Sequence, residues 1–350
     1  MEDLQATSYP LSINNHSAAF TNGTAAAITA SLVYVTPAGF DTKLVLVVLF
    51  VSFGILGLGG NILILYFVSK KNSVPFHQSS PFLRNFNLYM KSLAISDILA
   101  CLISVPVVCA QLMFDIFQNG WPCKIVRYIA VVFNCVTINN LMAISTERFL
   151  STRDVPKTFS SSTVRKLVYA AWVTGSLIVF APAATMNGVR HDISATHYTV
   201  VCDKDTSYLP YRVIVAGFVL TQHVIPSIGL ICINVILAVR VWKRGKRTID
   251  IQKDNAIRAR VRSQQLKATY ILILVTLAFV IPYSSLLYYA AFVVVFKPSL
   301  DFQDDFLIRY ISAVLILSSS SINFIIYVVQ MKDFRAFLKK VLCCKGDGNA

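Results

Sequence analysis

The sequence predicts an all-α membrane protein: a seven-transmembrane helix bundle with a short amphipathic eighth helix. Of the 350 residues, 55% are hydrophobic and only 14% are charged, and the mean hydropathy is +0.62. This composition is far too apolar for a soluble domain of this length. A helix crosses a bilayer with about 20 apolar residues, and seven stretches reach that length. They cover about 43–68, 86–112, 124–146, 167–186, 209–239, 268–294 and 305–330.

Basic residues lie mainly in alternate connections between these spans. With the N-terminus outside, the inner connections and the C-terminal tail hold 24 of the 32 Lys and Arg residues but only 6 of the 17 Asp and Glu residues. The inner side then carries a formal charge of +18 and the outer side −2, with Asp97 inside a span. This asymmetry indicates an extracellular N-terminus, and we expect a multi-pass protein of the plasma membrane. The basic surface is a membrane face, so no nucleic-acid partner is expected.

Residues 1–41 are predicted to form an extracellular glycosylated tail. They are rich in Ala, Ser, Thr and Asn without periodicity, which is typical of disorder. Glycosylation sequons begin at Asn15 and Asn22, on the side that receives glycans. The seven-helix domain is expected over residues 42–332.

Residues 333–350 are predicted to form a cytoplasmic amphipathic helix and tail. Apolar residues recur there at helical spacing, opposite basic residues, so the helix is expected to lie on the lipids of the inner leaflet. Cys343 and Cys344 follow it and are candidates for palmitoylation. The alternative is two plain thiols.

Two cysteines and a β-branched segment mark the outer side. Only Cys123 and Cys202 lie there outside the spans, so they are expected to form a disulfide. The segment Tyr198–Cys202 predicts a hairpin over the mouth of the bundle. Prolines interrupt four of the spans, which predicts kinked helices. These prolines are Pro106, Pro182, Pro226 and Pro282.

Short motifs recur in order along the spans. They are Gly60-Asn61, Asn87 with Leu93 to Asp97, Trp121-Pro122-Cys123, Glu147-Arg148-Phe149, Trp172, Pro226, Pro282, and Asn323 to Tyr327. In this order and spacing they resemble the rhodopsin-like (class A) G-protein-coupled receptor family over about residues 43–342. The resemblance implies a receptor that converts binding of an extracellular ligand into activation of a heterotrimeric G protein. Arrestin is a further candidate partner.

The resemblance assigns G-protein coupling to the inner ends of spans three, five and seven. Glu147 and Arg148 would form an ion pair that closes the inner mouth, and Arg148 would turn towards the G protein on activation. Asn234 stands where the family usually has a tyrosine, and Tyr327 ends the motif of span seven. The alternative role of the pair is to anchor the helix end at the surface.

Asp97 is the only carboxylate deep inside a span, where an unpaired charge costs at least about 3 kcal/mol. The resemblance places Asn61 and Asn323 beside it, together with a sodium ion, the only cofactor expected. Thr137 and Ser319 are the candidate hydroxyl groups from spans three and seven. The alternative is a protonated Asp97 that is hydrogen-bonded to asparagines, with no ion. The other serines of the run 318–321 are assigned to close helix packing.

Three positions depart from the family pattern. Val280 replaces a tryptophan, Phe324 replaces a proline and Asn234 replaces the tyrosine of span five. These departures leave the fold unaffected, but they argue against the activation mechanism that is usual in the family. They motivate the alternative of an atypical seven-helix receptor that scavenges a ligand or scaffolds a partner without G-protein coupling.

Inspection excludes two ligand classes. A retinal receptor needs a lysine midway along span seven, but 310–331 contains none, and an amine receptor needs an aspartate where Ala130 stands. A peptide is favoured, because the predicted hairpin resembles the lid of peptide receptors and acidic outer residues would attract a cationic ligand. A lipid or other small molecule, or no conventional ligand, are the alternatives. The candidate pocket residues are Gln111, Arg127, Gln222, His223, Tyr283, Tyr289 and Arg309.

No set of residues supports catalysis, so the protein is not expected to be an enzyme. The five histidines lack the spacing of zinc ligands, and no Ser–His–Asp set lies on one side of the membrane. A transporter would need an inverted repeat or several charges at the midplane. Because only Asp97 lies there, a transporter is the less favoured alternative.

Overall fold

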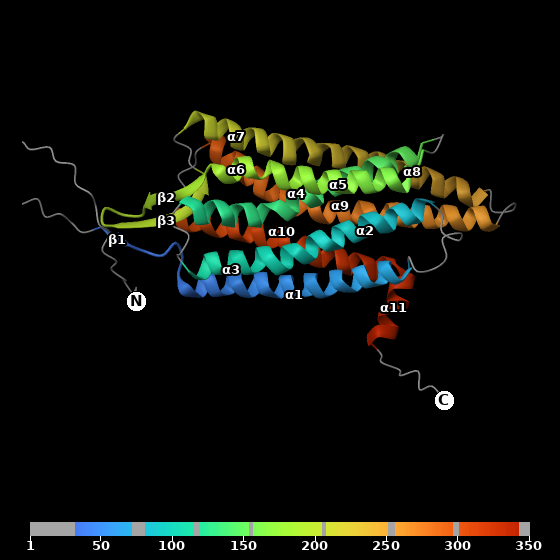
Figure 1. The fold of residues 1–350 in the computed structure, drawn as a ribbon, viewed down its shortest axis with the longest axis horizontal. Coiled ribbons are helices and arrows are strands. Elements are labelled where there is room, and N and C mark those ends of the chain that lie inside the picture. Colours follow the sequence, from blue (N-terminus) through green and yellow to red (C-terminus); the bar gives the residue numbers. More distant parts are fainter. Residues whose placement is uncertain are drawn as a thin grey trace, which may run out of the picture.

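The computed structural model describes residues 32–71, 81–114, 120–153, 157–204, 208–250, 256–296 and 301–342. Within them, seven helical units are long and apolar enough to cross a membrane, which confirms the predicted bundle. Figure 1 shows these units side by side, with a small sheet at one end of the bundle and α11 at the other. The elements are β1 (Val33–Tyr34), α1 (Phe40–Lys71), α2 (Pro81–Leu99), η1 (Ala100–Ser104), α3 (Val105–Met113), α4 (Gly120–Ser151), α5 (Ser161–Ile178), α6 (Phe180–Ala184), β2 (Met186–Asp192), β3 (His197–Lys204), α7 (Leu209–Val219), η2 (Leu220–Val224), α8 (Ile225–Asp250), α9 (Ala256–Phe296), α10 (Phe302–Gln330) and α11 (Lys332–Leu342).

The four predicted proline interruptions take three forms. Pro106 and Pro226 each follow a π-helical turn, η1 in the second span and η2 in the fifth. Proline lacks an N–H and its ring clashes with the carbonyl four residues earlier, and that carbonyl lies inside the wider π turn. In the fourth span α5 ends and α6 restarts before Pro182, whereas Pro282 lies inside the continuous α9.

The predicted hairpin is present at the outer end of the bundle. Strands β2 and β3 pair antiparallel, with Gly188 opposite Cys202. Cys202 forms the predicted disulfide with Cys123 at the start of α4. Strand β1 adds a third, parallel strand to β3, and the ring of Tyr34 packs edge-on against Tyr198 with centroids 5.9 Å apart.

Residues 32–39 differ from the prediction that 1–41 form a disordered tail. The N–H of Val33 donates to the carbonyl of Thr196 at 2.8 Å, and α1 already begins at Phe40. A two-residue strand is too short to show alternation in a sequence, so the pairing partner alone reveals it. Asn15, Asn22, Cys343 and Cys344 lie outside the described residues.

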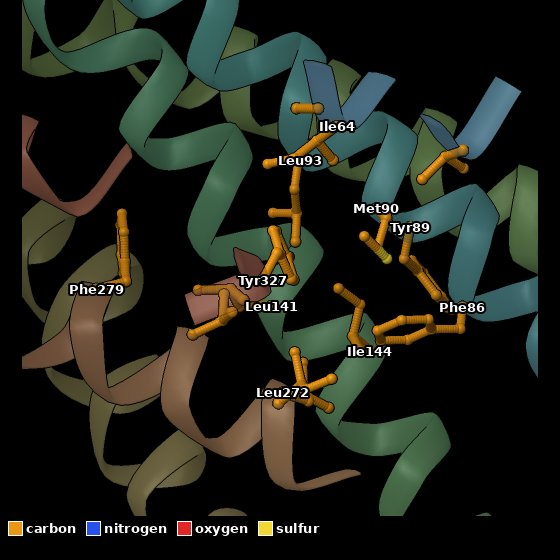
Figure 2. Packing of buried hydrophobic residues seen from close by; sticks show 14 of the residues in the cluster. Ile64, Phe86, Tyr89, Met90, Leu93, Leu141, Ile144, Leu272, Phe279 and Tyr327 are labelled. Atoms are coloured by element: carbon orange, nitrogen blue, oxygen red, sulfur yellow. The ribbon is translucent and has the colours of Figure 1, made fainter. Parts of the chain in front are cut away.

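The main hydrophobic core extends from the middle of the bundle to its inner end. Figure 2 shows Leu93 of α2, Leu141 of α4 and Tyr327 of α10 in this cluster, with Leu272 and Phe279 from α9. Residues of the first, fourth and fifth spans and of α11 also belong to it. One continuous core therefore links every span to the inner end.

Helix α11 is amphipathic, but its apolar face is largely covered by protein. Phe334 is only 1% exposed and packs edge-on against Phe67 of α1, with centroids 5.2 Å apart. Leu338 is buried in the same cluster, whereas Val341 is exposed. Part of the face that was expected to lie on lipid therefore docks on the bundle.

Candidate functional site

A cavity of about 380 Å³ opens beneath the β2–β3 hairpin and is lined by residues of the surrounding helices and of both strands. Six of the seven predicted pocket residues line it. They are Gln111, Arg127, His223, Tyr283, Tyr289 and Arg309. Gln222 is not among the lining residues, because neighbouring residues on a helix point in different directions and its neighbour His223 is the one that faces inward.

Other polar residues of the cavity were not among the candidate pocket residues, although Asp203 is one of the acidic outer residues expected to attract a cationic ligand. Lys43 of α1, Ser104 of η1, and Asp203 and Lys204 of β3 also line it. The disulfide offered a signal for the last two, because residues just after Cys202 must lie close to the outer end of α4. No such signal pointed to Lys43 or Ser104.

Arg309 of α10 joins the hairpin to the bundle. Its Nη1 donates to Oδ2 of Asp203 at 3.0 Å, and its Nε lies 2.8 Å from Oδ2 of Asp305. The hydroxyl of Tyr289 donates to Oδ1 of Asp305 at 2.5 Å, which brings α9 into the network. Burial alone would raise the pKa of Asp203, but Arg309 and Lys204 outweigh it and hold that pKa below its ordinary value.

His223 and Tyr283 lie in the wall of the cavity where it meets the core. The Tyr283 hydroxyl and Nε2 of His223 are 3.2 Å apart, and their rings are in contact, with centroids 4.5 Å apart. His223 is 5% exposed, and its Nδ1 has no hydrogen-bond partner among the described residues. His223 therefore contributes a buried nitrogen without a partner to the wall of the cavity.

Asp97 lies at the centre of a buried polar cluster. It accepts hydrogen bonds from the hydroxyl of Ser320 at 3.0 Å and from the amide of Asn323 at 3.1 Å. Asn61 reaches the cluster indirectly, because its amide donates to the carbonyl of Ser320 at 3.1 Å. Thr137 contacts the hydroxyl of Ser96 at 3.1 Å, one residue before Asp97.

Ser319 is not the span-seven hydroxyl that contacts Asp97. Its hydroxyl donates to the carbonyl of Ile316 in its own helix at 2.7 Å. Ser320 was assigned to helix packing but makes the contact instead. Residues three and four positions before Asn323 share one helix face, so the rotation of α10 decides between them.

Arg148 is fully buried at the inner end of α4, with its guanidinium carbon 5.7 Å from the ring centroid of Phe86 on α2. Glu147 is also buried, and its Oε1 accepts a hydrogen bond from the amide of Asn85 at 2.7 Å. Sequence reasoning paired Glu147 with Arg148 and did not single out Asn85. Helix α2 therefore holds the inner end of α4 through both residues.

The other two candidates for G-protein coupling, Asn234 and Tyr327, are also buried. Tyr327 lies in the core cluster (Figure 2). The amide of Asn234 donates to the carbonyl of Leu230 in its own helix at 2.8 Å. Its Oδ1 is buried without a hydrogen-bond partner among the described residues, so it is available to a group that moves towards it.

Comparison with known proteins identifies the family. The family model described as "7 transmembrane receptor (rhodopsin family)" matches residues 60–327. The chain belongs to this family. Membership makes it a multi-pass membrane receptor with an extracellular ligand and a G protein as partners.

The receptor is similar to two known proteins in sequence. It is 23% identical over 303 residues to the allatostatin-A receptor of Bombyx mori, across 83% of this chain and 77% of that protein. It is 24% identical over 305 residues to melanopsin of Branchiostoma belcheri, across 83% of this chain but 41% of melanopsin. Squid rhodopsin has the same fold, with a TM-score of 0.69 and 18% identity over 89% of each chain.

Two of the departures from the family pattern are core residues in this receptor. Val280 is 2% exposed and lies in the main cluster. Phe324 packs against the same cluster, with its ring 6.1 Å from that of Phe334 and nearly perpendicular to it. Apolar packing therefore occupies both positions.

Proposed function

We propose that this receptor lies in the plasma membrane with its N-terminus outside, binds an extracellular peptide in the cavity beneath the hairpin, and activates a heterotrimeric G protein. One observation carries the proposal: a residue of the cavity and the buried Arg148 belong to the same helix, α4. From Arg127 to Arg148 the helix rises roughly 32 Å at about 1.5 Å per residue, which is close to the thickness of a bilayer core. A ligand at one end and a transducer at the other would share one rigid element.

A peptide is supported by the shape of the outer end and by one relative. The cavity of about 380 Å³ lies in the usual range for ligand pockets, roughly 300–1,000 Å³, and the three-stranded sheet above it extends its wall. The similar Bombyx mori protein is named as a receptor for allatostatin-A, so allatostatin-A is the first peptide to test. Stimulated nucleotide exchange on a panel of G-protein α-subunits is the measurement.

Coupling can be tested without knowing the ligand. Ligand-free nucleotide exchange would be compared between wild type and Arg148→Ala at matched surface expression, with Arg153→Ala, an exposed residue just past the helix end, as the control. We expect a basal signal that only Arg148→Ala abolishes. A signal that survives Arg148→Ala would contradict the assigned role. Arrestin recruitment without exchange on any α-subunit would favour the scavenging or scaffolding alternative that Val280 and Phe324 motivate.

We also propose that a sodium ion binds beside Asp97. The described partners of Asp97 are neutral donors, which leave the carboxylate charge uncompensated in a span. Asn323 turns its amide nitrogen to Asp97, while its Oδ1 is buried without a hydrogen-bond partner in the described chain. Carboxylate, amide and hydroxyl oxygens are the ligands that hard cations prefer, so this donor set fits sodium.

Four further assignments complete the proposal. Helix α11 would contact inner-leaflet lipids through its exposed residues, with palmitoyl groups on Cys343 and Cys344. Asn15 and Asn22 would carry glycans. Arrestin would be a second cytoplasmic partner. No catalytic activity is proposed.

A further inference from the structure

We infer that the cavity selects a ligand with an acidic group, a carboxylate next to apolar residues of a peptide, and that Arg127 and Lys204 bind that carboxylate. The inference rests on the proposed peptide-receptor function and adds the chemistry that the cavity recognises.

The charges that line the cavity do not balance. Four of the six charged side chains are basic and two are acidic, which gives a formal charge of +2. They are Lys43, Arg127, Asp203, Lys204, Asp305 and Arg309. The outer face as a whole is slightly acidic, and its aspartates led to the expectation of a cationic ligand. Within the cavity the sign is reversed.

Both acidic side chains are already occupied by protein groups. The two oxygens of Asp203 accept from the backbone N–H of Lys204 at 2.7 Å and from Arg309 at 3.0 Å. Those of Asp305 lie 2.5 Å from the hydroxyl of Tyr289 and 2.8 Å from Nε of Arg309. A cationic ligand would have to displace these partly buried, charge-assisted contacts. The aspartates therefore serve to position Arg309 and the hairpin.

Arg127 and Lys204 form no ion pair within the described part of the chain, although the charge of Asp203 acts on both. Arg127 lies one turn after Cys123 and Lys204 two residues after Cys202, so the disulfide between these cysteines brings both cations to one wall. The hydrogen bond that the structure gives Arg127 is a long one, 3.5 Å to the carbonyl of Cys202, at the weak limit for such bonds.

The surroundings of Lys204 also favour an added anion. Burial lowers the pKa of its ammonium, and Arg309 and Arg127 lower it further, while Asp203 and Asp305 oppose this without cancelling it. Neighbouring cations that disfavour each other's charge gain from a shared anion. A carboxylate bound between two basic side chains gains charge-assisted hydrogen bonds from both.

Most of the uncharged lining residues are apolar, and they set the character of the rest of the ligand. Aromatic and aliphatic side chains of the third, fifth, sixth and seventh spans surround the space, among them Phe133, Phe218, Leu286 and Phe306. A group carrying a second charge would lose its hydration there without a partner. The cavity therefore fits a hydrophobic peptide segment with a single acid at its outer side.

The test uses purified full-length receptor in nanodiscs and pools of synthetic apolar hexapeptides in four forms. One form has a free C-terminal carboxylate, a second is its C-terminal amide, a third is the amide with one internal glutamate, and a fourth is the amide with one internal lysine. Ligand-induced thermal stabilisation identifies binders, and titration gives their Kd. We expect an acidic form to bind at least about tenfold more tightly than its neutral amide. The first and third forms distinguish a chain terminus from a glutamate side chain as the source of the carboxylate.

Three outcomes would overturn the inference: amides that bind as tightly as acids, a preference for the lysine form, or no stabilisation by any acidic pool. Arg127→Gln and Lys204→Gln should each remove the acid preference, whereas Arg127→Lys should largely keep it. Arg190→Gln, on the same hairpin but paired with Asp192 outside the cavity, should have no effect. Retained acid preference in both glutamine variants would also contradict the inference.

The failure of this inference is separable from failure of the proposed function. Ligand-free exchange that depends on Arg148 reports coupling without using the cavity. If that signal holds but acid preference is absent, only the carboxylate assignment fails. If the signal itself is insensitive to Arg148, the proposed function fails first.

Discussion

Phe324 of α10 lies directly against Gly60 of α1, so close that a Cβ added to Gly60 would be 2.5 Å from the Cβ of Phe324. Non-bonded carbon atoms are optimally about 3.5–4.0 Å apart. The bulk of Phe324, which stands where the family usually has proline, therefore fits because the facing residue has no side chain. Small residues at helix contacts allow this kind of close approach in membranes.

Gly60→Ala should destabilise the receptor by about 1–3 kcal/mol through overpacking. Gly59→Ala is the matched control, because nothing lies within 4 Å of a Cβ at Gly59. Thermal unfolding in detergent is the measurement. Adding Phe324→Ala should restore much of the stability lost in Gly60→Ala. Equal melting temperatures for the Gly60 and Gly59 variants would show that the two helices separate at no cost.

Ser320→Ala should be more harmful than Ser319→Ala. The first removes a hydrogen bond to the buried carboxylate of Asp97, at a cost of about 1–3 kcal/mol. The second removes only a hydrogen bond to the carbonyl of Ile316 within the same helix. That carbonyl already accepts a backbone hydrogen bond of the helix. Thermal unfolding of both variants at one sodium concentration tests the order. The reverse order would mean that Ser319 is the partner of Asp97.

Asp97→Asn should make the receptor insensitive to sodium. If an ion binds the folded wild type, raising sodium to tenfold above its Kd stabilises the receptor by about 1.4 kcal/mol, with ionic strength held constant by choline chloride. The amide of the variant lacks the charge that attracts the ion, so its unfolding temperature should not change with sodium. A wild type as stable in choline as in sodium, or a variant that responds equally, would contradict the sodium proposal.

The spans, the hairpin and the disulfide were predictable from sequence because each leaves a one-dimensional signal. Apolar length marks the spans, β-branched content marks the segment ending at Cys202, and location outside the spans leaves Cys123 as its partner. Most of the candidate pocket residues were predictable because they lie near the outer third of their spans. Whether any of them contacts a ligand stays a prediction.

Contacts that depend on helix rotation were not predictable. The sequence does not decide whether Ser319 or Ser320 contacts Asp97. The packing of α10 against α2 orients Ser320 towards Asp97. The pairing of Arg309 with Asp203 joins residues 106 positions apart, and it reverses the ligand charge that the acidic outer face indicated. The sequence shows how many charges lie outside, but not which of them neutralise one another.

Loss of the disulfide should destabilise the outer end. Cys123 and Cys202 are 79 positions apart, and a link across a loop of that length contributes about 4.5 kcal/mol in the chain-entropy model. Cys123→Ser should therefore lower surface expression and the unfolding temperature. Cys232→Ser, which changes an exposed free cysteine, is the control. Expression and ligand response that match wild type in Cys123→Ser would show that the hairpin is held by the Arg309 network alone.

Arg240 of α8 caps the inner end of α4. Its Nη1 donates to the carbonyl of Phe149 at 3.1 Å and lies 3.4 Å from the hydroxyl of Thr152. Its guanidinium carbon lies 4.5 Å from the ring centroid of Phe149. The carbonyl of Phe149 belongs to the last turn of α4, where carbonyl groups lack partners within the helix and favour a cation.

Arg240→Ala should therefore loosen the end of α4 that carries Arg148 and raise basal G-protein coupling, together with a loss of stability of about 1 kcal/mol. Arg240→Lys keeps the charge but not the planar group that both stacks and donates, so its effect should be intermediate. Lys243→Ala, at an exposed position on the same helix, is the control. Ligand-free nucleotide exchange at matched surface expression is the measurement. A fall in basal exchange in Arg240→Ala would mean that the contact supports the coupled state. Unchanged exchange would mean that the contact does not keep Arg148 in its inactive position.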